Sequence, residues 1–260
     1  MVEALSPRST KIEAAAANLE ALGRNTYPGR GIAIGFNRTG TKGFEVYWVM
    51  GRSEQSRNRR LELKGDVVRT VPLDPSRIED PSLIIYNAMR IARGAHVVSN
   101  GDQTDDVVTA LLGEDSYDTA LLRRTFEPDG PNFTPRITGI LFPQGDASHF
   151  VLSTINKESP KSDKPAHVFY SYGMESLRGF GRVIHTYAGN GNPVPAMRSK
   201  PYIVPLDEHI GDVAATFWGL LNPDNRVAMV VKSVDLGTGD VAYRIANRYG
   251  SWSVHPATAA

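Results

Sequence analysis

The chain has 260 residues, of which 41% are hydrophobic and 22% charged, a composition typical of a globular protein. Lys and Arg number 29 against 28 Asp and Glu, so the small net charge argues against nucleic acid or an anionic membrane as a partner. The lack of cysteine excludes disulfides, thiolate catalysis and Cys-based metal sites. We find no signal peptide pattern and no apolar run near the roughly 20 residues that span a bilayer, so we expect a soluble, cytoplasmic protein.

The N-terminal segment has the pattern of an amphipathic helix. Thr10 and Glu13 have capping-box spacing ahead of an apolar series, and Gly23 is a typical C-terminal stop. We therefore expect residues 1–25 to form a helical extension of a single domain that comprises residues 1–260.

Strand patterns outnumber helical patterns in the rest of the chain. Runs 31–36 and 44–50 flank residues 37–43, whose Gly and Asn content is typical of a hairpin turn. Most runs follow one another without an intervening helix, which predicts antiparallel hairpins and an α+β fold. Residues 156–165 are polar and contain prolines, and we expect a surface loop there. The other expected strands are 67–71, 83–86, 95–99, 137–142, 150–155, 167–170, 183–187 and 227–234, and the other expected helices are 105–112, 117–124 and 210–221.

An arginine-rich run at residues 51–60 follows the apolar strand 44–50. It mixes Arg52 and Arg59 with the hydrogen-bonding side chains of Ser53 and Asn58. Cations and amides at the end of a strand predict a site for an anionic ligand such as a phosphate. A solvated loop explains the same run equally well.

Glycines flank Arg30 just before the first strand of the expected sheet. Gly29 and Gly31 allow another strand or a ligand to approach the backbone closely. Ordinary turn chemistry is the more common explanation of such a pair, and the spacing does not match a dinucleotide-binding fingerprint.

Tyr86, Asn87 and Arg90 follow the apolar residues 83–85. A phenol, an amide and a guanidinium therefore emerge together near the expected end of a strand. A tyrosine at such a place more often packs at the edge of the core than takes part in catalysis.

Ser99 and Asn100 begin a polar turn between an expected strand and an expected helix. The turn offers hydrogen-bond donors and acceptors near a helix N-terminus, where backbone N–H groups favour an anion or a carbonyl oxygen. Asp102 or Thr104 in the same turn equally fits a simple helix cap.

The loop between Glu127 and Arg136 contains three prolines, which restrict its backbone. A stiff loop suits the positioning of side chains, so Glu127 and Asp129 are candidate general bases. A carboxylate on a loop is more often merely solvated. The six histidines lack the spacing of metal ligands, and we expect no metal site.

The order of these segments resembles the archaeal-type IMP cyclohydrolase family over about residues 26–140. That family closes the second purine ring in the last step of inosine monophosphate (IMP) synthesis. The resemblance implies a fold similar to N-terminal nucleophile hydrolases, a four-layer αββα sandwich of two mostly antiparallel sheets. It rests on Tyr27-x-Gly29-Arg30, Arg52-Ser53 with Asn58-Arg59, Tyr86-Asn87 with Arg90, Val97 to Gly101 with Thr104-Asp105, and Thr134 to Ile137.

The resemblance also implies roles for individual residues. Arg59 would stabilise the reacting groups electrostatically, Tyr86 would donate or relay a proton, and Glu127 would accept one. The partner would be a small purine nucleotide, with no cofactor and no metal. The residues expected to bind the substrate are Arg30 and Arg52 at the phosphate, together with Ser53, Asn58, Asn87, Arg90, Ser99, Asn100 and Arg136.

Two other functions stay open at this point. One is an amidohydrolase in which cleavage exposes Thr26 as an N-terminal nucleophile, with its own amine as the base. The other is a purine nucleotide-binding protein without catalytic activity. The sequence also leaves a homo-oligomer open.

Overall fold

The computed structural model describes residues 7–78 and 84–258, and two seven-stranded sheets form its centre. In both sheets, neighbouring strands run antiparallel. Sheet A consists, in spatial order, of β11 (Tyr202–Pro205), β10 (Phe180–His185), β1 (Gly31–Phe36), β2 (Lys42–Met50), β12 (Arg226–Asp235), β13 (Val241–Asn247) and β14 (Ser253–Thr258). Sheet B consists of β3 (Arg59–Lys64), β4 (Val67–Pro72), β5 (Asn87–Ala92), β6 (Ala95–Ser99), β7 (Arg136–Phe142), β8 (His149–Lys157) and β9 (Pro165–Gly173).

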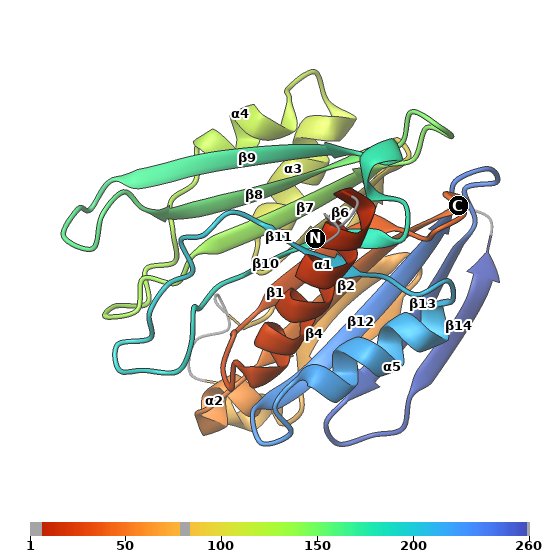
Figure 1. Ribbon diagram of the computed structural model, residues 1–260. Coiled ribbons are helices and arrows are strands. Elements are labelled where there is room, and N and C mark those ends of the chain that lie inside the picture. Colours follow the sequence, from red (N-terminus) through yellow and green to blue (C-terminus); the bar gives the residue numbers. More distant parts are fainter. Residues whose placement is uncertain (1–6, 79–83, 259–260) are drawn as a thin grey trace, which may run out of the picture.

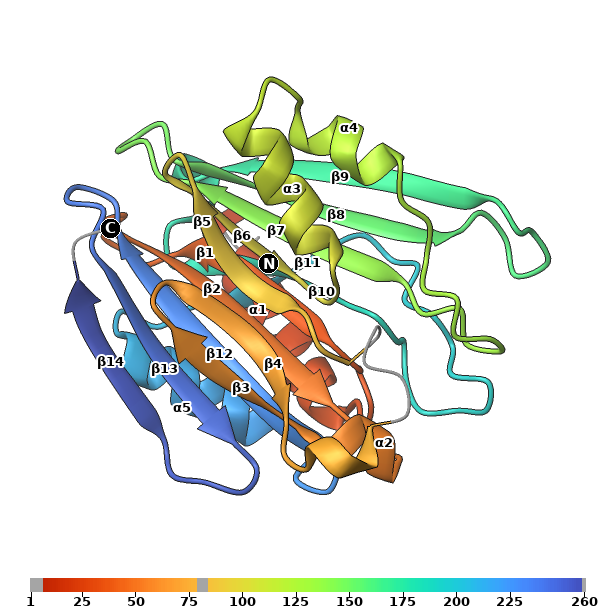
Figure 2. The same cartoon turned by 180° about the vertical axis from the view of Figure 1, so that it is seen from behind.

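Helices cover the outer faces of both sheets. α1 (Pro7–Arg24) and α5 (Ile210–Leu220) lie against sheet A in Figure 1. α3 (Gln103–Leu112) and α4 (Tyr117–Leu122) lie against sheet B in Figure 2. The layers follow the order helix, sheet, sheet, helix, which confirms the α+β sandwich expected from the sequence. The short helices are α2 (Glu54–Arg57), η1 (Pro75–Arg77) and η2 (Glu175–Leu177).

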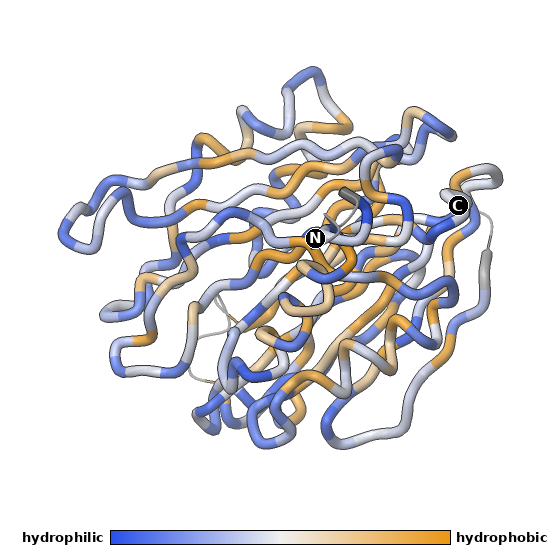
Figure 3. Tube along the Cα trace, viewed as in Figure 1, coloured by the Kyte–Doolittle hydropathy of each residue, from blue (hydrophilic) through white to orange (hydrophobic). Residues whose placement is uncertain are grey.

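Strand β2 shows how the layers are held together. Tyr47 and Val49 belong to the buried cluster between the two sheets, whereas Val46 and Trp48 belong to the cluster beneath α1 and α5. Because both faces of the strand are buried, its sequence is apolar almost throughout instead of alternating. Figure 3 shows the hydrophobic residues gathered along such central strands. Burial of one such side chain contributes roughly 1.5–3 kcal/mol to stability.

The start of the N-terminal helix differs from the sequence expectation. α1 begins at Pro7, so Thr10 lies inside the helix and the capping-box prediction was wrong. The expected C-terminal end was close, because the helix ends at Arg24. Near that end, Leu22 packs in the same buried cluster as Phe217 of α5, which fixes α1 on the sheet.

The prediction of a strand at residues 83–86 is wrong for residues 84–86, which the structure describes. Leu83 lies outside the described residues, and β5 begins only at Asn87. Tyr86 instead exchanges hydrogen bonds with Thr70 of β4. The Thr70 N–H donates to the Tyr86 carbonyl at 3.0 Å, and the Tyr86 N–H donates to the Thr70 hydroxyl at 2.9 Å. A side chain therefore takes the place of a ladder acceptor, and regular pairing starts one residue later.

Several short elements were not anticipated from the sequence. They are α2 within the arginine-rich run, and strands β3, β11, β13 and β14. Within residues 7–78 and 84–258, no helix has the length and apolar character needed to cross a membrane.

Candidate active site

A cavity of about 520 Å³ opens at one end of the sandwich. Its walls come from residues just before β1, β3 and β7 and just after β2 and β10. Antiparallel hairpins bring alternate strand ends to the same edge of a sheet, so segments far apart in sequence meet there. The lining residues are Tyr27, Gly29, Arg30, Met50, Arg52, Ser53, Gln55, Ser56, Arg59, Ile84, Glu127, Asp129, Asn132, Tyr187 and Val194.

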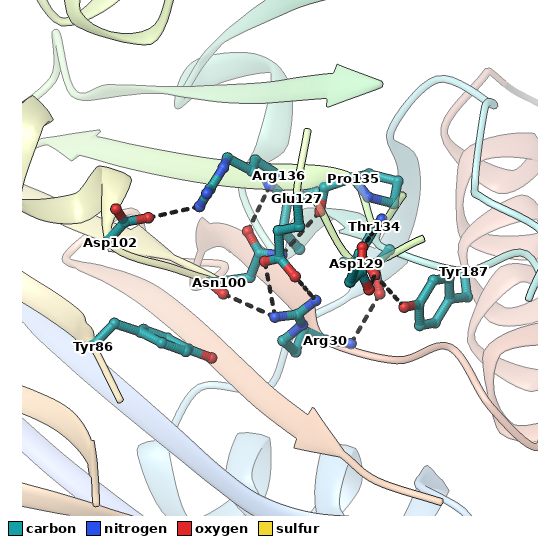
Figure 4. A network of polar contacts seen from close by, with 12 residues as sticks. Arg30, Tyr86, Asn100, Asp102, Glu127, Asp129, Thr134, Pro135, Arg136 and Tyr187 are labelled. Atoms are coloured by element: carbon teal, nitrogen blue, oxygen red, sulfur yellow. Dashed lines mark hydrogen bonds and ion pairs between the residues drawn. The ribbon is translucent and has the colours of Figure 1, made fainter. Parts of the chain in front are cut away.

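A buried ion pair forms one wall of the cavity. Arg30 donates to the two carboxylate oxygens of Glu127 at 3.0 and 2.8 Å (Figure 4). The same guanidinium donates to the backbone carbonyl of Asn100 at 3.2 Å. Arg30 is 7% exposed and Glu127 2% exposed, so water screens this pair very little. The geometry is the bidentate fork that arginine forms with carboxylates.

Burial and pairing act against each other in this pair. Burial raises the pKa of Glu127, and the Arg30 guanidinium opposes that rise without cancelling it. Burial alone would lower the pKa of Arg30, but Glu127, Tyr86 and Tyr187 together outweigh it, and the pKa is raised well above its ordinary value. Arg30 donates one N–H to each Glu127 oxygen, so neither oxygen carries a hydrogen between them and the pair is ionised.

Two further side chains, Asn100 and Arg136, stabilise the backbone near this pair. The Asn100 side chain donates to the carbonyl of Pro135 at 2.9 Å and accepts from the N–H of Ile137 at 2.8 Å. Arg136 donates to Asp102 at 2.8 Å. Asn100 and Arg136 therefore brace the loop before β7, which carries Glu127, and neither lines the cavity.

Arg59 contributes the guanidinium that is free to meet a ligand. It is the first residue of β3 and is only 7% exposed, yet it lines the cavity. Its Nε donates to the carbonyl of Ser56 at 3.0 Å, which fixes the side chain. Among the residues that the structure describes, no carboxylate forms an ion pair with Arg59.

The turn before Arg59 is a capped helix and not a solvated loop. Ser53 caps α2, because its hydroxyl accepts from the N–H of Ser56 at 3.1 Å and the Ser56 hydroxyl accepts from the N–H of Ser53 at 3.0 Å. Arg52 lies beside this cap with its guanidinium 4.7 Å from the centre of the Tyr27 ring. It also donates to the carbonyl of Gly191 at 2.9 Å.

Tyr86 does not line the cavity itself, but its hydroxyl is directed toward Arg30, which does (Figure 4). The hydroxyls of Tyr86 and Tyr47 are 2.6 Å apart, so one donates to the other. Tyr47 is fully buried, and burial together with Tyr86 raises its pKa well above the ordinary value. Tyr47 therefore keeps its proton and positions the Tyr86 hydroxyl.

A chain of three polar side chains forms the opposite wall. The sequence had singled out Asp129 but neither Tyr187 nor the connection of the three. The hydroxyl of Tyr187 is hydrogen-bonded to that of Thr134, which in turn donates to Asp129. Tyr187 also stacks on Tyr27, with ring centres 5.7 Å apart. No local pattern marks Tyr187, because it reaches the cavity from the end of β10, more than fifty residues beyond Thr134.

The other expected binding residues have partners away from the cavity. Asn58 exchanges two hydrogen bonds of 2.8 Å with the backbone of Asp74. Asn87 and Arg90 both bind Asp105 of α3, on the outer side of sheet B. The buried hydroxyl of Ser99 donates to Thr138 on the neighbouring strand at 3.1 Å. These four side chains complete the framework around the cavity, and none of them lines it.

Within the described part of the chain, no group of three or more His, Asp or Glu side chains is arranged to hold a metal ion. Thr26, the nucleophile of the amidohydrolase alternative, is exposed and does not line the cavity. Its carbonyl accepts from the Asn225 amide at 3.0 Å.

Comparison with known proteins gives one consistent family. The model of the IMP cyclohydrolase-like protein family matches residues 27–239. An IMP cyclohydrolase from Methanocella arvoryzae is 29% identical over 154 residues, which cover 50% of this chain and 75% of the relative. Those from Methanopyrus kandleri and Methanothrix thermoacetophila are 35% and 33% identical over 116 and 121 residues, or 43% and 44% of this chain.

The match to the last two relatives is partial, since the chain spans 57% of the length of each. The family model, by contrast, covers most of the chain and every residue of the cavity wall. The resemblance inferred from the order of sequence segments is thereby confirmed. The protein belongs to the IMP cyclohydrolase-like family.

Proposed function

We propose that the protein is an IMP cyclohydrolase. It would convert 5-formamidoimidazole-4-carboxamide ribonucleotide (FAICAR) into IMP and water. The observation that carries the proposal is that a chain of this family brings Arg59 and the Arg30–Glu127 pair to one cavity, and that the Tyr86 hydroxyl is directed toward Arg30. Within the described residues, Arg59 has no ion-pair partner. The names of the relatives support the same reaction.

Ring closure makes three demands on the protein. The carboxamide nitrogen must attack the formyl carbon, although its lone pair is delocalised and it is a weak nucleophile. The site must therefore hold the substrate in the reactive rotamer, stabilise the negative charge that develops on the formyl oxygen, and move protons. Well-oriented systems gain about 7–11 kcal/mol from positioning, whereas one general acid or base gives about 10²–10⁴-fold. Orientation is thus the larger contribution.

Arg52 and the α2 cap form the phosphate end in this proposal. Arg52 is exposed at the rim, carries a permanent charge and is held by Tyr27. Gln55 supplies an amide beside it, whereas the Ser53 N–H and hydroxyl are already donated to the Ser56 hydroxyl. Arg30, which was also expected at the phosphate, suits that role less, because Glu127 already neutralises its charge.

Arg59 is the proposed stabiliser of the formyl oxyanion. Its guanidinium is held in place through Nε, has no carboxylate partner in the described chain and lies in a largely desolvated wall. Preorganised charge in such a wall is stronger than the same charge in water. The positive charge would therefore act on the transition state with little reorganisation.

Tyr86 is the proposed proton donor to the oxygen that leaves as water. Its hydroxyl is positioned by Tyr47 and directed toward Arg30. Glu127 was expected to accept a proton, but both of its oxygens already accept from Arg30. We therefore assign Glu127 the role of holding the Arg30 guanidinium against the reacting groups.

The test is incubation of the pure protein with FAICAR, without folate, while IMP formation is followed by absorbance. Product above the uncatalysed rate supports the proposal, and no product contradicts it. Calorimetry with the analogue that lacks the formyl group, run in parallel, identifies a protein that binds but does not catalyse. Intact mass spectrometry tests the amidohydrolase alternative, which requires a chain that begins at Thr26.

The nucleotide substrate is charged and does not cross membranes freely, which supports a cytoplasmic location.

A further inference from the structure

We infer that Tyr187, Thr134 and Asp129 form a proton relay that removes the proton from the attacking carboxamide nitrogen. This inference rests on the proposed function and assigns that reaction a proton acceptor. The three side chains lie in a row in Figure 4, on the side of Arg30 away from Tyr86. Tyr187 and Asp129 line the cavity, and Thr134 is fully buried between them.

The hydrogen bonds of the relay run in one direction, from Tyr187 through Thr134 to Asp129. The Asp129 carboxylate accepts at both oxygens, from the backbone N–H of Thr134 and from the Thr134 hydroxyl. The Thr134 hydroxyl has a single hydrogen, which is committed to Asp129. Tyr187 must therefore donate its hydrogen to Thr134. The Tyr187 oxygen keeps its lone pairs for a donor in the cavity, and the substrate N–H is such a donor.

Asp129 is better placed than Glu127 to receive the proton. Glu127 is held by Arg30 at both oxygens. Asp129 has no ion-pair partner among residues 7–78 and 84–258, so no guanidinium competes with an incoming proton.

Tyr187 is held firmly at the start of the relay. Its ring stacks on Tyr27, and its N–H donates to the carbonyl of Pro28 at 3.1 Å. The His185 ring donates to the Tyr187 carbonyl at 2.9 Å. Burial raises the pKa of Tyr187, although Arg30 opposes the shift, so the phenol transfers a proton without becoming a stable phenolate.

Ring closure moves two protons from the substrate nitrogens and removes one oxygen as water. The carboxamide nitrogen forms a bond to the formyl carbon, and the C=O electron pair moves to the oxygen beside Arg59. The nitrogen becomes acidic as this bond forms. Its proton passes to the Tyr187 oxygen while the Tyr187 proton passes to Thr134 and the Thr134 proton to Asp129. Tyr86 gives the formyl oxygen one proton and water in the cavity gives the second, so that this oxygen leaves as water. The formamide nitrogen loses its proton to the cavity water, and Asp129 and Tyr86 then exchange protons with that water, which restores both side chains. The two protons lost by the substrate nitrogens thus equal the two that the product water carries.

A matched pair of substitutions tests the relay. Thr134→Val keeps the shape of the side chain but removes the hydroxyl, whereas Thr134→Ser keeps the hydroxyl. We expect Thr134→Val to lower kcat by about 10²–10⁴-fold with little change in KM, and Thr134→Ser to stay near wild type. Tyr187→Phe leaves the Thr134–Asp129 contact intact, and we expect it to lower kcat as much as Thr134→Val does. The double variant should be no worse than either single one, because the residues act as a unit.

Two further readouts separate a relay from a structural role. The solvent deuterium isotope effect on kcat should differ between wild type and Tyr187→Phe, and the thermal midpoint of Tyr187→Phe should stay near that of wild type. Wild-type kcat in Tyr187→Phe or in a folded Thr134→Val would overturn the relay. An inactive wild-type protein would instead contradict the proposed function, so the two failures are distinguishable.

Discussion

Arg59 and Arg60 are neighbours on β3 with opposite surroundings. The Arg59 side chain is buried in the cavity wall, whereas Arg60 is exposed on the other face of the strand. The alternation of a strand thus sends one of two adjacent guanidiniums into the site and the other into solvent. The pair offers an internal control for the role of Arg59.

Arg59→Ala should lower kcat for FAICAR closure by about 10²–10³-fold, the usual cost of removing one donor to a developing oxyanion. Arg60→Ala removes the same charge from the same strand and should leave kcat unchanged. Steady-state kinetics on both variants check the prediction. Equal activity of the two variants would remove Arg59 from the mechanism.

Tyr86→Phe should lower kcat by about 10²–10⁴-fold, because the phenol is the proposed proton donor. Tyr47→Phe should cost less, since Tyr47 only positions the Tyr86 hydroxyl. Tyr202→Phe serves as the control, because the Tyr202 hydroxyl is buried without a hydrogen-bond partner in the described chain and lies outside the cavity. If Tyr86→Phe and Tyr202→Phe have the same kcat, Tyr86 is not the donor.

Glu127→Gln should destabilise the protein by about 3–5 kcal/mol, because it leaves the Arg30 charge buried without a counter-charge. Glu62→Gln breaks the exposed 3.5 Å pair with Arg69 and should cost less than about 1 kcal/mol. Urea unfolding of both variants measures the difference. A Glu127→Gln variant as stable as Glu62→Gln would show that the buried pair is not ionised.

A second buried ion pair permits a test of stability away from the cavity. Lys232 and Glu45 are both fully buried, with 3.0 Å between Nζ and Oε2, on neighbouring strands of sheet A. Lys232→Met should cost about 3–5 kcal/mol, and adding Glu45→Leu should recover much of that loss because no unpaired charge remains. A double-mutant cycle in urea checks this. Additive losses in the double variant would contradict it.

His185 gives a prediction for pH dependence. Burial lowers its pKa to about 4, although the hydrogen bond to the Tyr187 carbonyl works in the other direction. The unfolded chain takes up this proton near pH 6.5 and the folded protein only near pH 4. The contribution of His185 to the free energy of unfolding is therefore complete above pH 6.5 and falls as the pH drops toward 4.

A proton NMR titration of the histidine rings measures this directly. His185 should stay neutral until about pH 4. His185→Asn keeps a hydrogen-bond donor without a titrating group, so its unfolding free energy should fall less than that of wild type between pH 6.5 and 4. A His185 ring that titrates near 6.5 in the folded protein would contradict the prediction.

Local patterns were enough to predict much of the fold. The strand expected at residues 31–36 has those bounds in the structure, because apolar β-rich residues lead into a Gly- and Asn-containing turn. The local structure at Tyr86 was harder to predict from the sequence, because the Tyr86 N–H donates to the Thr70 side chain. A side chain sixteen residues away leaves no mark on the local pattern.

The same distinction applies to the site. Arg30 and Arg59 were singled out as cations near the ends of expected strands, and Glu127 as a carboxylate in a proline-rich loop, all within a recognisable order of segments. The pairing of Arg30 with Glu127 was not predictable, because 97 residues separate them and only the folded sheets bring them together. Tyr187 was missed for that reason too.

The most direct test of the central claim uses FAICAR with a carbon-13 label in the formyl group, followed by NMR. We expect the wild-type protein to move the label to the ring carbon between the two pyrimidine nitrogens of IMP, and Arg59→Ala to do so far more slowly. Release of the label as formate would contradict it, because the protein would then hydrolyse the formamide instead of closing the ring.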